Sequence, residues 1–275
     1  MIGKQTSAIS VLCLSRNVVA GLIFSLTAAS FLFSSCASLT GRIPEKSADH
    51  AEAVNLLSAL NTKNQNLKAF KGIGRIKLWH NHSPRIDERV AWAGTNSSNL
   101  LIVVLVSGHP AIKFSTDGNF LYYLDLTTKP TSFKKIRSTD ACLDRLVSIP
   151  IRSRDVVSLL SGRIPIHEYT SAGLIKNKLK KGYILVLKKR WRGVIEKIYL
   201  DENKSDIQKV EIFKSDGSLK YRAAFKTMQH IKGYHVPLKL VISNDDGAGF
   251  MLDIERYMAD AAVSPSIFAL SPPKK

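Results

Sequence analysis

The sequence predicts a mainly β domain in which a long antiparallel sheet curls into a half-open barrel. Most of the chain after residue 72 consists of short apolar stretches, and turns rich in Asp, Asn and Gly join neighbouring stretches. Residues 219–227 show the cleanest strand pattern, because apolar side chains alternate there with Lys220, Arg222 and Lys226. Hairpins between sequence neighbours make the sheet antiparallel, and a sheet this long usually curls.

A helix is expected before the first strand, over residues 47–61. Ser47 can cap its N-terminus, and Asp49 and Glu52 suit the positive end of the helix dipole. The apolar residues that share one side of this helix are Ala53, Val54, Leu57 and Leu60.

A first group of strands follows. The run 99–106 is continuously apolar, which predicts a strand covered on both sides. Residues 116–119 form a turn, with Gly118 available for a left-handed position. The strands expected in this group are residues 74–79, 85–94, 99–106, 111–115 and 120–126.

Two short helices then interrupt the strands and are expected to cover one open end of the curl. The first spans residues 140–148, and the second spans 153–161, with Ser153 as its cap and Gly162 after its end. Pro150 separates the two. Their apolar residues are Leu143, Leu146, Val147, Val156, Val157, Leu159 and Leu160.

A second group of strands continues towards the C-terminus as three hairpins. The expected pairs are residues 183–189 with 194–200, 206–214 with 219–227, and 237–243 with 250–257. The tail, residues 264–275, contains three prolines and is expected to form a short terminal strand and a frayed end.

The N-terminal residues have the order of an export signal. Lys4 and Arg16 are the only charged residues among the first 35, and residues 18–33 form an apolar run shorter than a membrane-spanning helix. The stretch FLFSSC, which ends at Cys36, resembles the lipobox of bacterial lipoproteins, although Phe33 stands where Leu is usual. This resemblance implies cleavage before Cys36 and a lipid on its side chain.

The expected organisation is a lipoprotein signal peptide at residues 1–35, a lipidated tether at 36–46 and a single β domain at 47–275. Ala37 follows Cys36 at the position where Asp signals retention in the inner membrane. We therefore expect a lipid-anchored protein of the outer membrane that faces the periplasm.

The chain is strongly basic, with 40 Lys and Arg against 22 Asp and Glu and a net charge of +18. Removal of Lys4 and Arg16 with the signal would leave +16. Export argues against nucleic acid as the partner, and leaves a membrane surface, a phosphorylated glycolipid or an acidic protein. Lysines that prevent pairing at strand edges explain the same charge.

No sequence motif supports catalysis or a cofactor. The chain has no phosphate-binding loop, nucleophile elbow or zinc-spaced cysteine pair. Cys142 has no partner for an internal disulfide and is expected to be a small core residue. His80 and His82 have the spacing of a metal pair on one strand face, but no further ligand stands out and a polar hairpin end explains them. We expect no enzyme activity, metal or cofactor.

Five short stretches carry a further signal. They are residues 70–76, 100–106 with 108–110, 149–165, 234–240 and 267–272. The third has a Pro, a short apolar helix and then a Gly and a Pro. Together with the order of elements, these stretches resemble the outer-membrane lipoprotein receptors of the Lol pathway, which have the LolA/LolB fold.

The resemblance implies a LolB-like protein that binds the acyl chains of lipoproteins in an apolar barrel cavity and helps to localise them to the outer membrane. Its partners would be lipoprotein cargo and a periplasmic carrier, and it would act as a monomer without making or breaking a bond. The residues expected to line the cavity are Trp79, Trp92, Phe114, Tyr122, Tyr221 and Phe225. The residues expected to form the helical lid are Leu143, Leu146, Val156, Leu159 and Leu160.

The resemblance also implies a membrane-insertion loop at Gly108, His109 and Pro110, although this loop has no large aliphatic side chain. Two other functions stay open. The net charge favours a module that binds an anionic envelope glycolipid or polysaccharide. A structural envelope lipoprotein without a ligand is the other, because the same aromatic side chains can fill a barrel core.

Overall fold

The computed structural model describes residues 47–95, 98–138 and 141–273. These residues form a single antiparallel sheet of thirteen strands, preceded by the helix α2 (Ser47–Thr62) and interrupted by the short helices α3 (Asp144–Val147) and α4 (Ser153–Leu160). The predicted fold class is therefore confirmed.

Six strands precede the short helices and seven follow them. The first six are β1 (Ala69–His80), β2 (Ser83–Thr95), β3 (Leu100–Val106), β4 (His109–Thr116), β5 (Phe120–Asp125) and β6 (Ser132–Arg137). The others are β7 (Ser171–Lys176), β8 (Tyr183–Lys189), β9 (Gly193–Leu200), β10 (Ile207–Phe213), β11 (Leu219–Ile231), β12 (Tyr234–Ser243) and β13 (Gly249–Ala259).

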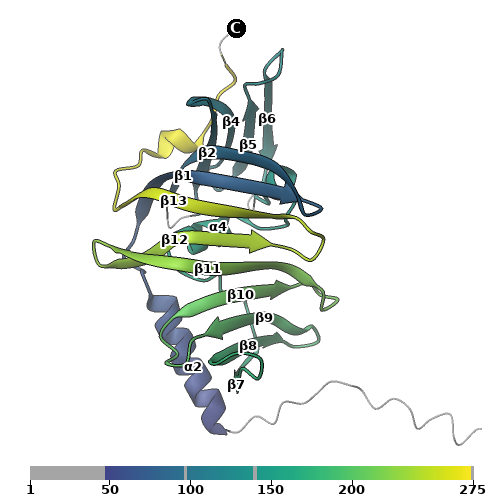
Figure 1. Ribbon diagram of the computed structural model, residues 1–275, viewed down its shortest axis with the longest axis vertical. Coiled ribbons are helices and arrows are strands. Elements are labelled where there is room, and N and C mark those ends of the chain that lie inside the picture. Colours follow the sequence, from purple (N-terminus) through teal and green to yellow (C-terminus); the bar gives the residue numbers. More distant parts are fainter. Residues whose placement is uncertain (1–46, 96–97, 139–140, 274–275) are drawn as a thin grey trace, which may run out of the picture. The chain divides into compact units, whose positions relative to one another are not determined.

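The strand order is β6-β5-β4-β3-β2-β1-β13-β12-β11-β10-β9-β8-β7. Two hairpin meanders are thus joined side by side where β1 pairs with β13. Each meander follows the rule that sequence neighbours pair. The edge strands β6 and β7 are not hydrogen-bonded to each other, so the sheet stays open (Figure 1).

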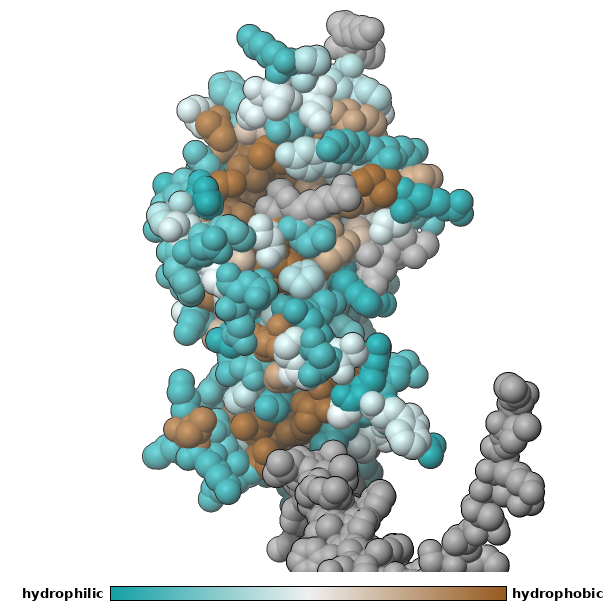
Figure 2. Space-filling model, turned by 90° about the vertical axis from the view of Figure 1, so that its right-hand side faces the viewer, coloured by the Kyte–Doolittle hydropathy of each residue, from teal (hydrophilic) through white to brown (hydrophobic). Residues whose placement is uncertain are grey.

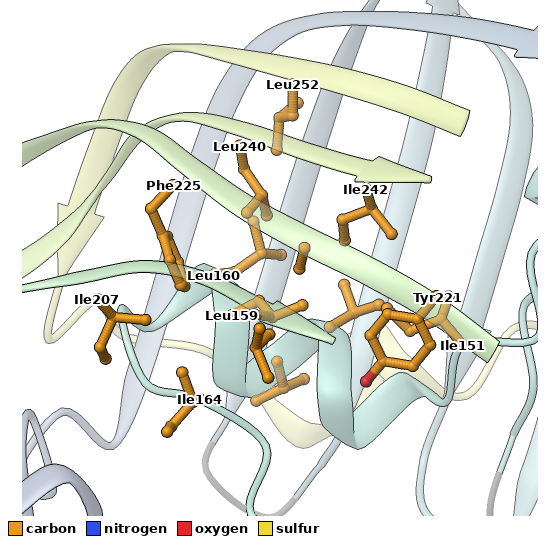
Figure 3. Packing of buried hydrophobic residues seen from close by; sticks show 14 of the residues in the cluster. Ile151, Leu159, Leu160, Ile164, Ile207, Tyr221, Phe225, Leu240, Ile242 and Leu252 are labelled. Atoms are coloured by element: carbon orange, nitrogen blue, oxygen red, sulfur yellow. The ribbon is translucent and has the colours of Figure 1, made fainter. Parts of the chain in front are cut away.

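Helix α4 lies within the curl of the sheet, behind β12 and β13 in Figure 1. Six of its eight residues are buried, so the helix fills the concave face of the sheet. The sequence pattern had predicted that it would cover one open end of the curl. Figure 3 shows Leu160 pointing towards Leu240 of β12. Side chains from both meanders and from α4 form one continuous apolar core.

Helix α2 packs beside the edge strand β7. Ala53, Leu57 and Leu60 are buried as predicted, whereas Val54 is exposed. His50 Nδ1 lies 2.9 Å from the carbonyl oxygen of Ala172 in β7, which ties the helix to this edge. The side chain of Ser47, the expected cap, lies outside the described residues.

Several expectations about elements were wrong. The predicted strands did not include β6 or β7, and the tail forms a short 3-10 helix, η1 (Pro265–Phe268), in place of a strand. Ser153 is the first residue of α4 and not its cap, because Arg152 holds the N-cap position, and its side chain does not cap the helix. β3 was expected to be covered on both sides, but most of its residues are only half-buried.

Hydrophilic side chains cover most of the face drawn in Figure 2, and apolar side chains gather in its upper half and near its lower end. Among the described residues, no helix is both long and apolar enough to cross a membrane.

Candidate functional site

A wholly apolar cavity lies between the concave face of the sheet and the two short helices. Its volume is about 60 Å³, and every side chain that lines it is aliphatic or aromatic. The lining residues of the first meander are Ile76, Leu78, Ile86, Val90, Trp92, Ile102, Val104 and Ile112. Those of the second meander are Leu240, Phe250 and Leu252.

The period of two along each strand places these side chains on one face. On β3, for example, Ile102 and Val104 line the cavity, and Val103 between them points to the other face. Trp92 lies flat over β1 because its register partner there is Gly72, where a Cβ atom would come within 2.2 Å of the ring. The missing side chain of Gly72 therefore makes room for the indole.

The helical segment forms the other wall of the cavity. Among the predicted lid residues, Leu143, Val156 and Leu160 line it, whereas Leu159 is fully buried elsewhere in the core. The side chain of Leu146 lies outside the described residues. Val147 and Ile151 also line the cavity, and Ile151 belongs to the connection that was expected only to separate the helices.

Of the aromatic residues expected to line the cavity, the structure places only Trp92 there. Phe114, Tyr221 and Phe225 belong to the same apolar core but do not reach the cavity. Tyr221 and Phe225 lie on β11, next to α4 (Figure 3). They fill the core beside the helix.

Trp79 and Tyr122 lie on the opposite face of the sheet. Trp79 follows the cavity residue Leu78 on β1, and its ring covers Gly249. Tyr122 pairs with Ser115, out of phase with the cavity residue Ile112, and its hydroxyl donates to Asp117 Oδ2 at 2.8 Å. Strand parity therefore excludes both from the cavity.

A buried polar cluster holds the side of α4 that faces away from the cavity. His167 Nδ1 lies 3.2 Å from Glu196 Oε2, and His167 Nε2 lies 3.6 Å from Asp155 Oδ1. The Tyr221 hydroxyl donates to Asp155 Oδ2 at 3.0 Å. Asp155 and Glu196 are almost fully buried, so the cluster links α4 to β9 and β11 inside the core.

Charge and burial shift the pKa values in this cluster. Burial alone would lower the pKa of His167, but its contacts with Asp155 and Glu196 raise that pKa to about 9. Burial raises the pKa of Glu196. Burial would also raise the pKa of Asp155, but the hydrogen bonds with His167 and Tyr221 outweigh it and lower that pKa. The imidazole therefore carries a positive charge at neutral pH.

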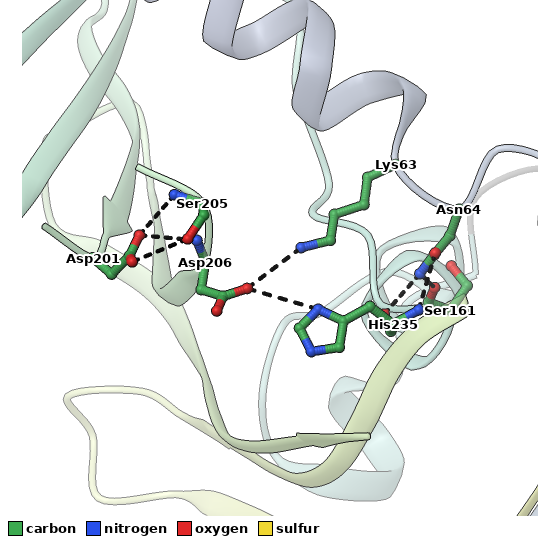
Figure 4. A network of polar contacts seen from close by, with 7 residues as sticks. All are labelled: Lys63, Asn64, Ser161, Asp201, Ser205, Asp206 and His235. Carbon is green, nitrogen blue, oxygen red and sulfur yellow. Dashed lines mark hydrogen bonds and ion pairs between the residues drawn. The ribbon is translucent and has the colours of Figure 1, made fainter. Parts of the chain in front are cut away.

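The C-terminal end of α4 is fixed by hydrogen bonds from Asn64, which follows α2. Its Nδ2 donates to the carbonyl oxygens of Ser161, at 2.8 Å, and of His235, at 2.7 Å (Figure 4). Gly162 has φ +73°, in the left-handed region, and a Cβ there would lie 2.1 Å from the His235 carbonyl oxygen. This confirms that the helix ends at a glycine, as the sequence predicted.

The predicted insertion loop is the tight turn between β3 and β4. Ser107 and Gly108 both have positive φ, which is typical of a two-residue hairpin turn, and His109 and Pro110 are exposed beside it. Val106, just before the turn, is 44% exposed and adds an aliphatic side chain to this tip.

The interpretation of His80 and His82 as a hairpin end is confirmed. Asn81 and His82 have positive φ and form the turn between β1 and β2. No cluster of three or more His, Cys, Asp or Glu side chains suited to a metal occurs within the described part of the chain.

Cys142 was expected to be a core residue, but it is only half-buried. Burial raises the pKa of its thiol, which disfavours a nucleophilic role.

No protein-family model and no curated protein sequence matches the chain. Solved structures do match it. A LolA superfamily protein from Nitrosomonas europaea is 15% identical, with a TM-score of 0.55, over 79% of this chain and 97% of the other. A putative outer membrane lipoprotein-sorting protein domain from Vibrio parahaemolyticus is 11% identical, with a TM-score of 0.53, over 80% and 97%.

The chain has a LolA-like fold. A DUF1329 family protein from Desulfovibrio piger is similar too, at 9% identity and a TM-score of 0.57, over 80% of this chain and 97% of the other. Identities this low establish the LolA-like fold alone. Within that fold, the apolar cavity and the polar cluster lie on two sides of α4.

Proposed function

We propose that this protein is an outer-membrane lipoprotein that binds the acyl chains of other lipoproteins beneath α3 and α4 and helps to localise them to the outer membrane. It would be exported by a signal peptide at residues 1–35 and anchored through a lipid on Cys36, both of which lie outside the described residues. Residues 36–46 would be the tether, and residues 47–275 one periplasm-facing domain.

The apolar cavity is the observation that carries this proposal. Apart from the indole N–H of Trp92, no polar side-chain group lines it, so it offers little to a polar substrate and suits a hydrocarbon chain. Each CH₂ group of an acyl chain that leaves water gains about 0.8 kcal/mol, which gives an apolar site a strong affinity for a lipidated protein. The similarity of the fold to a LolA superfamily protein and to a putative outer membrane lipoprotein-sorting protein domain supports this function as well.

The volume of the cavity adds a requirement. At about 60 Å³ it is far smaller than the roughly 300–1,000 Å³ of typical ligand pockets. Binding would therefore need α3 and α4 to move away from the sheet, so that the acyl chain replaces side chains such as Val156 and Leu160 against the first meander.

The proposal predicts that the chain without residues 1–36 accepts a lipoprotein from its periplasmic carrier, and that Val104→Phe removes most of this transfer. Val104 lines the cavity, and the larger ring would occupy its space. Gel filtration measures the transfer as the appearance of a complex between the lipoprotein and this chain.

Val103→Phe is the matched control, because it makes the same change one residue away on the other face of β3. It should keep transfer close to that of the unmodified chain, and thermal unfolding should show both variants folded. Equal transfer by the two variants, or none by the unmodified folded chain, would rule out the cavity as an acyl acceptor.

The small volume also favours a second candidate, a structural envelope lipoprotein with a filled core. That candidate predicts no transfer by any variant, together with a measurable loss of stability in Val104→Phe from overpacking, of roughly 1–3 kcal/mol.

A further inference from the structure

A second, much larger hollow lies on the other side of α4 from the apolar cavity. Its volume is about 750 Å³, and its walls are α4, the segment 163–168 after it, and the ends of the β8–β9 and β10–β11 hairpins. The two sites use different sides of the helix: Val156 and Leu160 line the cavity, whereas Arg154 and Ser158 line the hollow. A ligand of the hollow therefore need not enter the apolar site.

Basic side chains dominate this cationic hollow. The helical wall contributes Arg152, Arg154 and Arg163. The sheet wall contributes Lys189, Arg192, Lys214 and Lys220. Because they come from two walls, these seven cations converge on one space.

The two carboxylates that line the hollow are already engaged. Asp155 contacts His167 and Tyr221 in the buried cluster. Glu168 binds Lys189, with its Oε2 2.7 Å from Nζ. Glu168 is occupied by Lys189, and the charge of Asp155 is balanced first by His167, which also lines the hollow.

Four of the cations have no carboxylate within 4.0 Å among the residues that the structure describes: Arg163, Arg192, Lys214 and Lys220. Arg163 is half-buried, and its Nε donates to the Ser161 hydroxyl, at 3.0 Å. Burial disfavours the charged form of a guanidinium held in this way. Mutual repulsion between the cations adds to that cost.

Cations on the outer face of the sheet are arranged differently. Arg75 pairs with Asp87 at 2.5 Å, and Arg89 pairs with Glu255 at 2.6 Å. Lysines and arginines that only solubilise a strand face can be balanced in this way. The four hollow cations named above have no such partner among the described residues, which is the arrangement expected where an external anion supplies the missing charge.

We propose that the cationic hollow binds a phosphate-class anion, with the guanidinium groups of Arg163 and Arg192 and the ammonium group of Lys220 on its oxygens. Guanidinium groups match the geometry of phosphate oxygens, and the ammonium group acts as a point charge. The phosphate can be free in solution or can be the headgroup of a lipid, and both present the same chemistry to the site.

The test uses the full chain in a nonionic detergent, with pyrophosphate as the probe in a calorimetric titration at low salt. We expect binding, and we expect Arg192→Gln/Lys220→Gln to weaken it about tenfold or more, because the variant loses two charge-assisted bonds to the anion. A tenfold loss of affinity corresponds to about 1.4 kcal/mol. Pyrophosphate should also raise the melting temperature of the unmodified chain and not that of the double variant.

Arg137→Gln/Lys226→Gln is the matched control, since it removes one Arg and one Lys from exposed strand positions outside the hollow. It should bind pyrophosphate as the unmodified chain does.

A second experiment compares glycerol phosphate with phosphatidic acid in the same micelles, using phosphatidylcholine micelles as the blank. Tighter binding of phosphatidic acid identifies a lipid headgroup as the source, and equal binding identifies a free phosphate.

Two results would overturn the proposal. One is the absence of binding by pyrophosphate and by phosphatidic acid to the folded, unmodified chain. The other is an equal loss of affinity in the two double variants, which would mean that net charge alone attracts the anion. Neither result bears on the acyl cavity, whose test uses substitutions on β3.

Discussion

Raising the pH through the range from 6.5 to 9 is expected to lower the free energy of unfolding by about 3 kcal/mol, and His167 is the cause. Its pKa rises from the ordinary value of 6.5 to about 9 on folding, because Asp155 and Glu196 stabilise the charged imidazole. A group whose pKa is raised by folding contributes its full stabilisation below the unfolded value. That stabilisation is lost as the pH rises through the folded value.

The other members of the cluster do not reverse this sign. The raised pKa of Glu196 also makes stability fall as the pH rises. The lowered pKa of Asp155 costs stability only when acid protonates its carboxyl group. Urea unfolding at a series of pH values measures the effect.

His167→Gln is the variant that isolates the contribution of His167 to this pH dependence. Without the imidazolium, two buried carboxyl groups lose their cation, so the variant should be destabilised by about 3 kcal/mol at pH 6.5. Its stability should then fall less steeply up to pH 9 than that of the unmodified chain, and the remaining slope belongs to Glu196, whose pKa burial raises. An unchanged slope in the variant would assign the pH dependence to other groups.

Gly162→Ala is expected to destabilise the protein by roughly 3 kcal/mol or more. A Cβ at this position would lie 2.1 Å from the backbone carbonyl oxygen of His235, so α4 or β12 would have to shift. The left-handed backbone adds roughly 1–2 kcal/mol for a residue with a side chain. Thermal and urea unfolding would report the loss.

Two other glycines separate these two costs. Gly217 has φ +82° but open space around it, so Gly217→Ala should show only the backbone cost. Gly173, on β7, has neither a positive φ nor a near neighbour, so Gly173→Ala should be close to neutral. If Gly162→Ala cost no more than Gly217→Ala, the close approach of α4 to β12 would be refuted.

Local patterns predicted much of the fold. The hairpin between β10 and β11 follows from the alternation along residues 219–227, and the end of α4 follows from Gly162, because both depend on residues close together in the chain. The pairing of β1 with β13 joins strands far apart in sequence, and no local pattern could indicate it. The same holds for α4, whose apolar residues do not reveal that it fills the concave face.

The site was predicted less well than the fold. Six residues were predicted to line the cavity because their side chains are aromatic. Strand register places two of them, Trp79 and Tyr122, on the opposite face of the sheet. Most of the lining consists of Ile, Leu and Val, which any core strand contains. The cluster of Asp155, His167 and Glu196 was missed because its members come from α4, the segment after it and β9.

Trp92 gives the sharpest test of the proposed acyl site, because it is the tryptophan that lines the cavity. Trp79→Phe/Trp191→Phe would leave Trp92 as the only fluorophore of its kind. Trp79→Phe/Trp92→Phe would leave Trp191, which is 91% exposed and serves as the control. The probe is stearic acid with a nitroxide on its acyl chain, which quenches a tryptophan that it contacts. We expect saturable quenching of Trp92 and no saturable quenching of Trp191. Trp92 fluorescence that stays unchanged, or quenching that is equal in the two variants, would contradict an acyl chain beneath α4.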